Sequence, residues 1–171
     1  LAEFARKCEE AGVDAVVAEG FEAGGHNGRD ETTTMALLPS VRRTTALPLM
    51  AAGGIATGRS MLAALALGAE GVQIGSRFAV AEESSAHPAF KAMVIKAGEG
   101  DTLLSLKKLS PVRLLKNHFF EQVQAAEQSC ASAEELQTLL GRGRAKKGMF
   151  EGELDEGELE IGQIASIIDT V

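Results

Sequence analysis

Three short apolar runs, separated by segments with helical spacing, constrain the fold of this chain more than any other feature. The runs are residues 13–19, 47–52 and 71–74, and glycine follows the end of each one. Residues 33–44 and 57–67, which lie between them, carry apolar side chains at helical spacing. Strands that alternate with helices of this length predict right-handed βαβ units and a parallel sheet. We therefore expect an α/β fold.

The helices of this first part have recognisable ends and faces. Residues 1–11 predict an amphipathic helix with four residues on one face: Leu1, Phe4, Ala5 and Cys8. The Thr32–Thr34 run is expected to cap the helix at 33–44, in which Pro39 predicts a kink or a late start. Thr57 is expected to cap the next helix, with a buried stripe of Met61, Leu62, Leu65 and Ala66.

The pattern changes after Phe78. Residues 88–97 and 111–128 are interpreted as helices, with Pro88 and Pro111 in their first turns. Ser132 and Glu135 predict a capping box for a short helix at 132–141, and residues 162–171 predict a final apolar helix. We expect residues 1–82 to form the parallel α/β part and residues 83–171 a helical region that covers it.

A weak internal repeat refines the fold class. Residues 11–17 resemble residues 67–73, since a glycine that ends a helix and an acidic residue precede the strand in each. Repeated units of this kind suit a TIM (β/α)₈ barrel better than an open sheet, but three strands cannot close a barrel of eight. The expectation is therefore the C-terminal part of a TIM barrel, with the N-terminal half absent from this sequence and needed as its partner.

Charge and composition exclude several classes of function. The net charge is −7, and residues 151–160 hold six acidic residues and no basic one. The basic run at 142–147 is either a docking patch for an acidic partner or a solvated loop. Nothing suggests nucleic-acid binding, a metal-ligand cluster, a signal peptide or a bilayer-spanning segment, so we expect a cytoplasmic protein with no metal and no membrane contact. Cys8 and Cys130 are expected to be reduced thiols.

The residues at the strand ends carry the candidate chemistry. Gly53 and Gly54 follow the second run, while Gly75 and Ser76 follow the third. Glycines in such loops let backbone N–H groups approach a phosphate, although tight turns also use glycine. His26, in the glycine-rich loop after the first run, is either an acid, base or hydrogen-bond donor or a plain surface histidine. Arg77 either adds charge to an anion or pairs with Glu82 or Glu83.

Four blocks in this order resemble a known family. They are Ala18–Gly28, Thr33–Met35, Pro48–Ile55 and Gly68–Phe78. They are similar to the nitronate monooxygenase/2-nitropropane dioxygenase superfamily. Within it, residues 84–91, 111–117 and 162–165 resemble the FMN-dependent enoyl-acyl-carrier-protein reductases of fatty-acid synthesis.

The resemblance implies an FMN-bearing TIM barrel, of which this chain would hold about strands 6–8 and the C-terminal helical region. It places Gly53, Gly54, Gly75 and Ser76 at the flavin phosphate, Gly25 and Gln73 along the flavin, and His26 in the active site. NAD(P)H would be the co-substrate, and the substrate a small molecule or an acyl-carrier-protein thioester. A homodimer is a further expected assembly. Oxidation of alkyl nitronates is the alternative activity, and a non-catalytic half-barrel that assembles with a partner is the alternative class.

Overall fold

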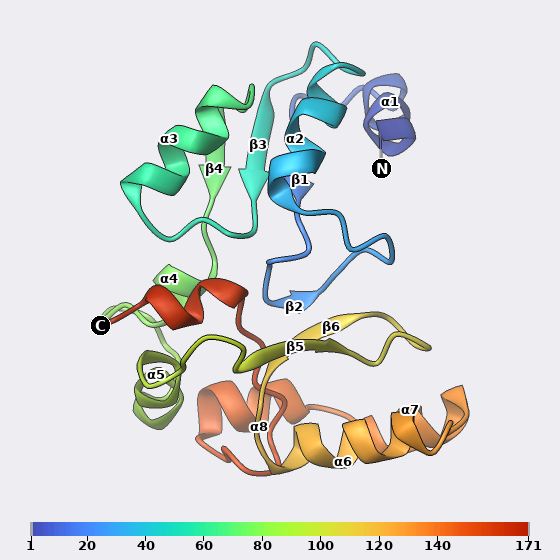
Figure 1. Cartoon of the computed structure of the whole chain (residues 1–171), viewed down its shortest axis with the longest axis vertical. Helices are drawn as coiled ribbons and strands as arrows, with labels where there is room; N and C mark the ends of the chain where they lie inside the picture. Colours follow the sequence, from blue (N-terminus) through green and yellow to red (C-terminus); the bar gives the residue numbers. More distant parts are fainter. Residues whose placement is uncertain (1, 171) are drawn as a thin grey trace.

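The structure is a computed structural model that describes residues 2–170. Its first part contains α1 (Ala2–Glu10), β1 (Val16–Glu19), β2 (Gly25–His26), α2 (Thr34–Arg42), β3 (Leu49–Ala52), α3 (Gly58–Ala66), β4 (Gly71–Gln73) and α4 (Ser76–Ala79). The second part contains α5 (Pro88–Ile95), β5 (Thr102–Ser105), β6 (Val112–Leu115), α6 (His118–Gln128), α7 (Ala133–Leu140), α8 (Arg144–Glu151) and the 3₁₀ helix η1 (Gln163–Ile167). Apart from β2 and α4, which lie against the lower elements, the first part forms an upper layer and the second part a lower layer (Figure 1).

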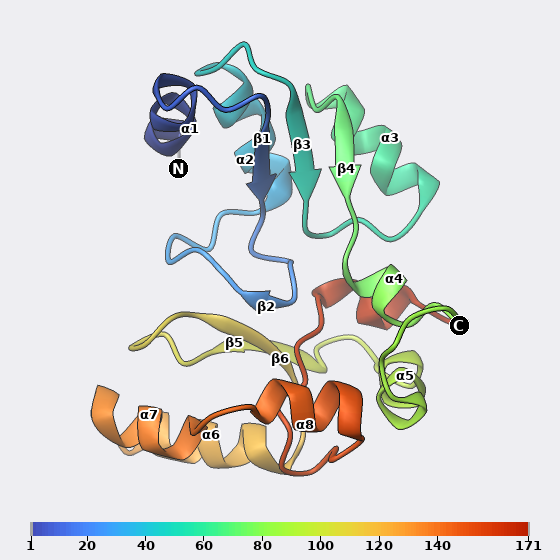
Figure 2. The same ribbon diagram turned by 180° about the vertical axis from the view of Figure 1, so that it is seen from behind.

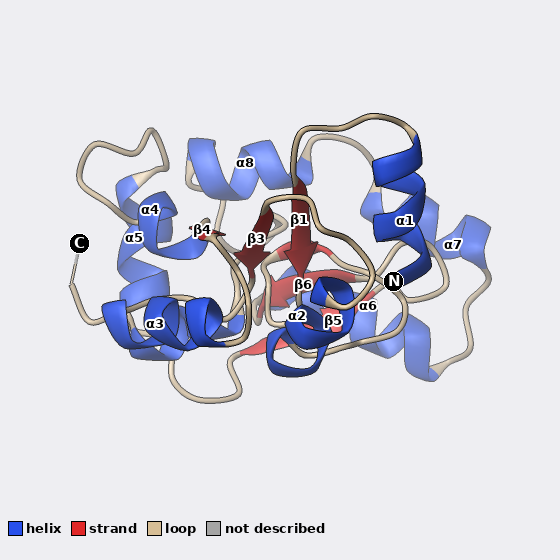
Figure 3. Cartoon of the chain, turned by 90° about the horizontal axis from the view of Figure 1, so that it is seen from above, coloured by secondary structure: helices blue, strands red, loops and turns tan. Residues whose placement is uncertain are grey.

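The upper layer is the expected parallel sheet, in the order β1-β3-β4. Val16 pairs with Leu49 and Met50 pairs with Gly71, so the three carboxyl ends lie together and point toward the lower layer (Figure 2). Helices α2 and α3 lie on one face of the strands, as the view from above also shows (Figure 3). The core between helices and sheet is purely aliphatic, with fully buried residues such as Leu38, Leu49 and Ala51.

The helix caps of this layer follow the sequence. Thr33 accepts a hydrogen bond from Ala36 N at the start of α2, and the helix continues through Pro39 without a late start. Thr57 and Ser60 form a reciprocal capping box at the start of α3. These local contacts satisfy backbone N–H groups that a helix leaves unpaired.

The predicted buried stripe of α3 is wrong. Met61, Leu62 and Leu65 are 41%, 67% and 37% exposed, and Ala66 is exposed as well. The helix instead buries Ala64 against the sheet, and no other described element covers its outer face. In α1, Ala5 is buried but Phe4 is 67% exposed, and Leu1 lies outside the described residues.

The lower layer contains a second sheet that the sequence analysis missed. Its order is β2-β6-β5, with antiparallel pairs His26–Val112 and Leu104–Arg113. The predicted helix at 111–128 is therefore wrong over its first residues: 112–115 form β6, and α6 starts after Asn117, which caps it. All four residues of β6 are buried, which an amphipathic helix at the surface would not allow.

The other lower-layer predictions have mixed outcomes. Helix α5 begins at Pro88, and α7 has the expected Ser132–Glu135 capping box. The final helix is wrong in type, because residues 163–167 form a short 3₁₀ helix that packs on α4 and α5, and Val171 lies outside the described residues. Two apolar clusters fill this layer, one around Phe90 and Leu159 and one around Phe119 and Phe120.

Two further expectations concern the membrane and the thiols. No helix among residues 2–170 combines the length and the apolar character needed to cross a bilayer. Cys8 is half-buried and Cys130 is exposed, and both are free thiols.

Candidate functional site

A cavity lies where the two layers meet. It has a volume of about 260 Å³ and opens at the carboxyl ends of β1, β3 and β4. The sheet supplies Glu19, Ala52 and Gln73, and the loops after the strands supply the glycines and Ser76. The segment that enters η1 closes the other side with Glu160, Ile161 and Gly162. In parallel α/β sheets this edge is the usual ligand position.

The cavity brings together five of the seven predicted site residues. They are Gly53, Gly54, Gln73, Gly75 and Ser76. Ser76 Oγ accepts a hydrogen bond of 2.9 Å from Gly162 N, which leaves its O–H free to donate to a ligand.

Two of these glycines have different reasons to be glycine. Gly53 has φ +84°, and a Cβ there would lie 2.7 Å from Gly20 O, so the fold itself excludes a side chain. Gly75 has φ −98°, and a Cβ there would meet no described atom within 4 Å. Protein packing therefore explains Gly53 but leaves the space beside Gly75 open for a ligand.

Gly25 and His26 lie beside the cavity and do not line it. His26 is exposed, and β2 is held against β6 by the Val112 pairing and by a 2.8 Å hydrogen bond from Asn27 N to Pro111 O. The side chain of Asn27 also donates to Ala23 O and Gly25 O, at 3.0 and 2.9 Å. These bonds fix the backbone that carries the imidazole.

A buried arginine fastens the glycine-rich loop to the lower layer. Arg113, 1% exposed, donates from Nε and Nη2 to Phe21 O at 3.1 and 2.7 Å, and its guanidinium lies 5.0 Å from the Phe21 ring centre. Burial lowers the pKa of Arg113, while the charges of Glu22 and Glu31 act in the opposite direction.

Arg77 does not form the predicted ion pair with Glu82 or Glu83, and its predicted role toward an anion stays a prediction. Its guanidinium donates to the backbone oxygen and the hydroxyl of Thr170 near the end of the described chain. The side chain thus ties α4 to the segment after η1.

Four carboxyl groups near the cavity were missed by the sequence analysis. Glu22 accepts hydrogen bonds from Thr34 N and Thr34 Oγ1 at 3.0–3.1 Å, so it helps to cap α2. Burial raises the pKa of Glu19 and of Glu160. Glu158 is 8% exposed, and burial together with the charge of Glu160 raises its pKa to about 7.

The sequence did contain a signal for the burial of Glu158 and Glu160. Charged and apolar residues alternate from Glu158 to Ile161, which is the period of a half-buried strand. Leu159 and Ile161 are indeed buried, and Glu160 forms an antiparallel bridge with Leu114. The sequence analysis missed this pattern because it described residues 151–160 only by their acidic composition. In the neighbouring basic run, Lys146 pairs with Glu151 and Arg144 with Glu156, whereas Arg142 and Lys147 are exposed.

The fold and the cavity define an α/β protein with a cavity at the carboxyl edge of a parallel sheet. The sequence profile of the nitronate monooxygenase family matches residues 2–171, and the chain belongs to this family. It is 37% identical over 163 residues to a probable nitronate monooxygenase of Bacillus subtilis, covering 91% of this chain and 47% of that protein. It is 44% identical over 123 residues to the putative monooxygenase Rv1533 of Mycobacterium tuberculosis, covering 71% and 32%.

Solved structures show the same relationship. The structure of FabK from Thermotoga maritima has a TM-score of 0.92 and 42% identity, and the match covers 99% of this chain and 53% of that one. A nitroalkane oxidase from Streptomyces ansochromogenes has a TM-score of 0.76 and 31% identity, covering 97% and 50%. The chain thus spans about half the length of these proteins and less than half of the two curated relatives.

The residues at the cavity fit the phosphate end of the flavin that such proteins generally use. The open space beside Gly75 and the free O–H of Ser76 lie in the same loop at the start of α4. Backbone N–H groups and a hydroxyl donor are the partners that a phosphate requires.

Proposed function

We propose that this chain carries the flavin-phosphate site and the active-site histidine of an FMN-dependent oxidoreductase. The observation that carries the proposal is the cavity at the carboxyl ends of β3 and β4, open beside Gly75 and lined by Ser76. In its finer form, the enzyme reduces enoyl-acyl-carrier-protein thioesters with NAD(P)H. The support for this form is the 42% identity and TM-score of 0.92 to the FabK structure over 99% of the chain.

We also propose that the upper layer is about strands 6–8 of a (β/α)₈ barrel whose other strands are not in this sequence. Three parallel strands carry helices on one face, while Val17 on the other face is 48% exposed. A barrel would cover this face with side chains from its remaining strands. The match to about half of each solved relative agrees with that arrangement.

Bound FMN would carry the electrons between NAD(P)H and the substrate. Gly53, Gly54, Gly75 and Ser76 would hold its phosphate, and Gln73 and Gly25 would lie along it. His26 would hydrogen-bond the thioester carbonyl or deliver a proton, and so stabilise the negative charge that develops on that oxygen. The bracing of β2 by Asn27 and β6 fixes the backbone from which this imidazole extends.

Oxidation of alkyl nitronates is a second candidate function. The family match and the name of the Bacillus subtilis relative favour it, as does the likeness to the nitroalkane oxidase. In this case His26 would act as a base or as an electrostatic partner of the nitronate. The same cavity serves both reactions, so the reductant distinguishes them.

The test uses the intact protein, loaded with FMN and kept without oxygen. NADH and then NADPH are added while the visible absorbance of the flavin is followed. Rapid bleaching that an enoyl thioester reverses supports the reductase. Bleaching by a nitronate, with none by either nucleotide, supports the monooxygenase. Failure of the intact protein to bind FMN would contradict both and favour a non-catalytic half-barrel.

A further inference from the structure

The loop between β1 and β2, residues 20–24, forms one wall of the cavity. Three of its residues line the cavity: Glu22, Ala23 and Gly24. The loop fits closely between two other walls. A Cβ on Gly53 would lie 2.7 Å from Gly20 O, and a Cβ on Gly24 would lie 2.4 Å from the carbonyl carbon of Ile161. A displacement of this β1–β2 loop would therefore change the shape of the cavity.

Arg113 on β6 holds this loop from the lower layer at two places. Its side chain donates from Nε and Nη2 to Phe21 O at 3.1 and 2.7 Å, and the guanidinium lies 5.0 Å from the centre of the Phe21 ring. Its backbone lies opposite Gly25 in the antiparallel pair of β2 and β6. One residue thus binds the start of the β1–β2 loop and also pairs with the strand that follows it.

The charge of Arg113 is buried without a carboxylate in contact. The residue is 1% exposed, and within residues 2–170 it takes part in no ion pair. Its guanidinium makes one further hydrogen bond there, to Thr102 Oγ1 at 3.5 Å. A charge taken out of water must be compensated by polar partners. The carbonyl and the ring of Phe21 are the nearest of these, so the burial of Arg113 and the position of Phe21 depend on each other.

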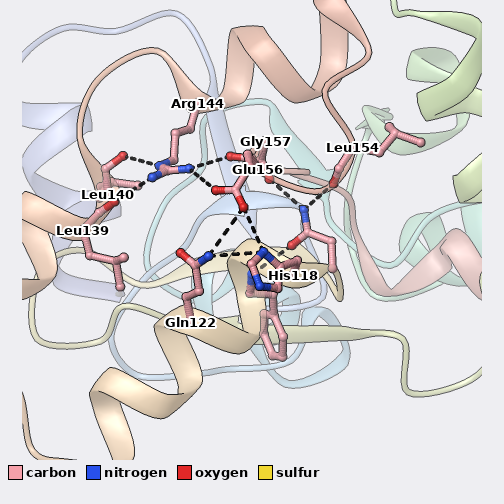
Figure 4. Close-up of polar contacts among 10 residues, drawn as sticks. His118, Gln122, Leu139, Leu140, Arg144, Leu154, Glu156 and Gly157 are labelled. Atoms are coloured by element: carbon pink, nitrogen blue, oxygen red, sulfur yellow. Dashed lines mark hydrogen bonds and ion pairs between the residues drawn. The ribbon is translucent and has the colours of Figure 1, made fainter.

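Arg144 on α8 offers a matched comparison, and Figure 4 shows its surroundings. Its guanidinium also lies over a phenylalanine ring, 4.3 Å from the centre of Phe119. It donates to three backbone carbonyls of the lower layer, those of Leu139, Leu140 and Glu156. The two arginines therefore make the same kinds of contact, but of the two only Arg113 reaches the β1–β2 loop.

The turn at Glu156 does not depend on Arg144 alone. His118 contacts the Glu156 carboxylate at 2.8 Å, and Asn117 donates to Leu154 O and Gly157 O (Figure 4). Replacement of Arg144 should therefore leave this turn in place, together with the segment that leads from it to the cavity.

We propose that Arg113 is a positioning residue for the cavity: it sets the place of the β1–β2 loop and so the wall that this loop forms. Hydrogen bonds from a guanidinium have a fixed direction, because its donors form a planar fork. Loss of this fork leaves Phe21 O without its donor and allows the loop to move, while the strands of the parallel sheet stay in place. This inference rests on the proposed function of the cavity as an FMN site, and its test separates the two.

The first measurement is amide hydrogen exchange of residues 20–28 in the intact protein. In Arg113→Met these amides should exchange at least about tenfold faster, because hydrogen bonds from a charged donor are lost. Residues 49–52 of β3 should keep their protection. Arg144→Met is the matched control and should leave exchange of residues 20–28 unchanged. Unchanged exchange in Arg113→Met, or equal acceleration in both variants, would overturn the proposal.

A conservative pair covers the case in which Arg113→Met does not fold. Arg113→Lys keeps the charge and a donor but loses the planar fork, so exchange of residues 20–28 should fall between the wild type and the methionine variant. Arg144→Lys is its control and should match the wild type in these residues. Equal exchange in the two lysine variants would count against a role of Arg113 in holding the loop.

The second measurement is the dissociation constant of FMN, with the visible spectrum of the bound flavin. Arg113→Met should raise the dissociation constant at least about tenfold and Arg113→Lys by less, whereas Arg144→Met should change it less than about twofold. A wild type that binds FMN with the same constant and spectrum as Arg113→Met would overturn this inference alone. A wild type that binds no FMN would overturn the proposed function and this inference with it.

Discussion

The two layers of this molecule are stabilised by different kinds of residue. The buried hydrophobic core between the parallel sheet and the helices of the upper layer consists of aliphatic side chains. The lower layer buries phenylalanines and, in addition, three charged side chains: Lys91, Arg113 and Glu158. The upper layer can therefore form from regular βα units, while the lower layer depends on specific polar contacts between distant segments.

The difference explains where the site lies. The strands of the parallel sheet end in glycine-rich loops, which expose backbone N–H groups but contribute few charged side chains to the site. The lower layer brings Arg113 and Glu160 to these loops and holds β2 beside them. His26 belongs to the upper layer in sequence and to the lower sheet in space, so it is the residue at which the two contributions meet.

The largest expected effect is that of replacing His26, the residue at which the two layers contribute to the site. Replacing His26 with alanine should slow substrate-driven flavin reoxidation by roughly 10²–10⁴, because a positioned proton donor is lost. Rapid mixing of the reduced intact protein with substrate measures this rate. His118→Gln, an exposed histidine on α6, is the control and should change the rate less than about twofold. A loss below tenfold with flavin still bound would leave His26 a purely structural residue.

A buried charge of the lower layer gives the next largest effect. Lys91 donates from Nζ to three carbonyls, of Ala81, Glu82 and Ser84, at 2.7–3.2 Å. Lys91→Met should lower the free energy of unfolding by about 2–4 kcal/mol, because these carbonyls lose a charged donor. Lys96→Met, exposed at the end of the same helix, should change it by less than about 0.5 kcal/mol. Equal effects in chemical unfolding would show that the buried charge does not matter.

A glycine of the upper layer comes third. Gly53→Ala should destabilise the protein by about 1–3 kcal/mol, because its φ of +84° and the nearby Gly20 O both oppose a side chain. Gly58→Ala, at the open start of α3, is the matched change and should be neutral or slightly stabilising. Thermal unfolding compares the two. Similar melting temperatures would mean that the loop can relax around the new methyl group.

The smallest expected effect is a pH dependence. The folded protein binds more protons at Glu158 than the unfolded chain between its ordinary pKa of 4.5 and about 7, so stability should fall as pH rises through this range. Glu158→Gln should remove this loss, on the order of 1–2 kcal/mol at pH 8. Denaturant unfolding at pH 5 and pH 8 measures it. A wild type that gains stability between these pH values relative to the variant would contradict the burial of Glu158.

The upper layer could be predicted from the sequence because its signals are local. Apolar runs, the caps at Thr33 and Thr57 and the glycines at strand ends all act within a few residues. The exposed stripe of Met61 and Leu62 was misassigned because helical spacing shows which residues share a face and does not show whether a neighbour covers it. The strand at Val112–Leu115 was missed because its partners, β2 and β5, are set by pairing that sequence periodicity does not encode.

The candidate site was predictable to a similar extent. Gly53, Gly54, Gly75 and Ser76 lie together because parallel strand ends always meet at one edge. Glu160 lies more than 130 residues after Gly25 in the sequence. The two residues are in contact only because the segment before η1 pairs with β6. Contacts of this kind depend on the tertiary fold. The acidic composition of residues 151–160 did not indicate that Glu158 and Glu160 would be partly buried.

The most direct test of the account is the dissociation constant of FMN for Gly75→Ala in the intact protein. A methyl group at this position would contact no described atom, and the backbone angles of Gly75 are compatible with alanine. The melting temperature without flavin should therefore stay unchanged. If the phosphate lies in the open space beside Gly75, the dissociation constant should rise at least about tenfold, through steric exclusion of the ligand. An unchanged dissociation constant would show that the glycine-lined cavity does not hold the flavin phosphate.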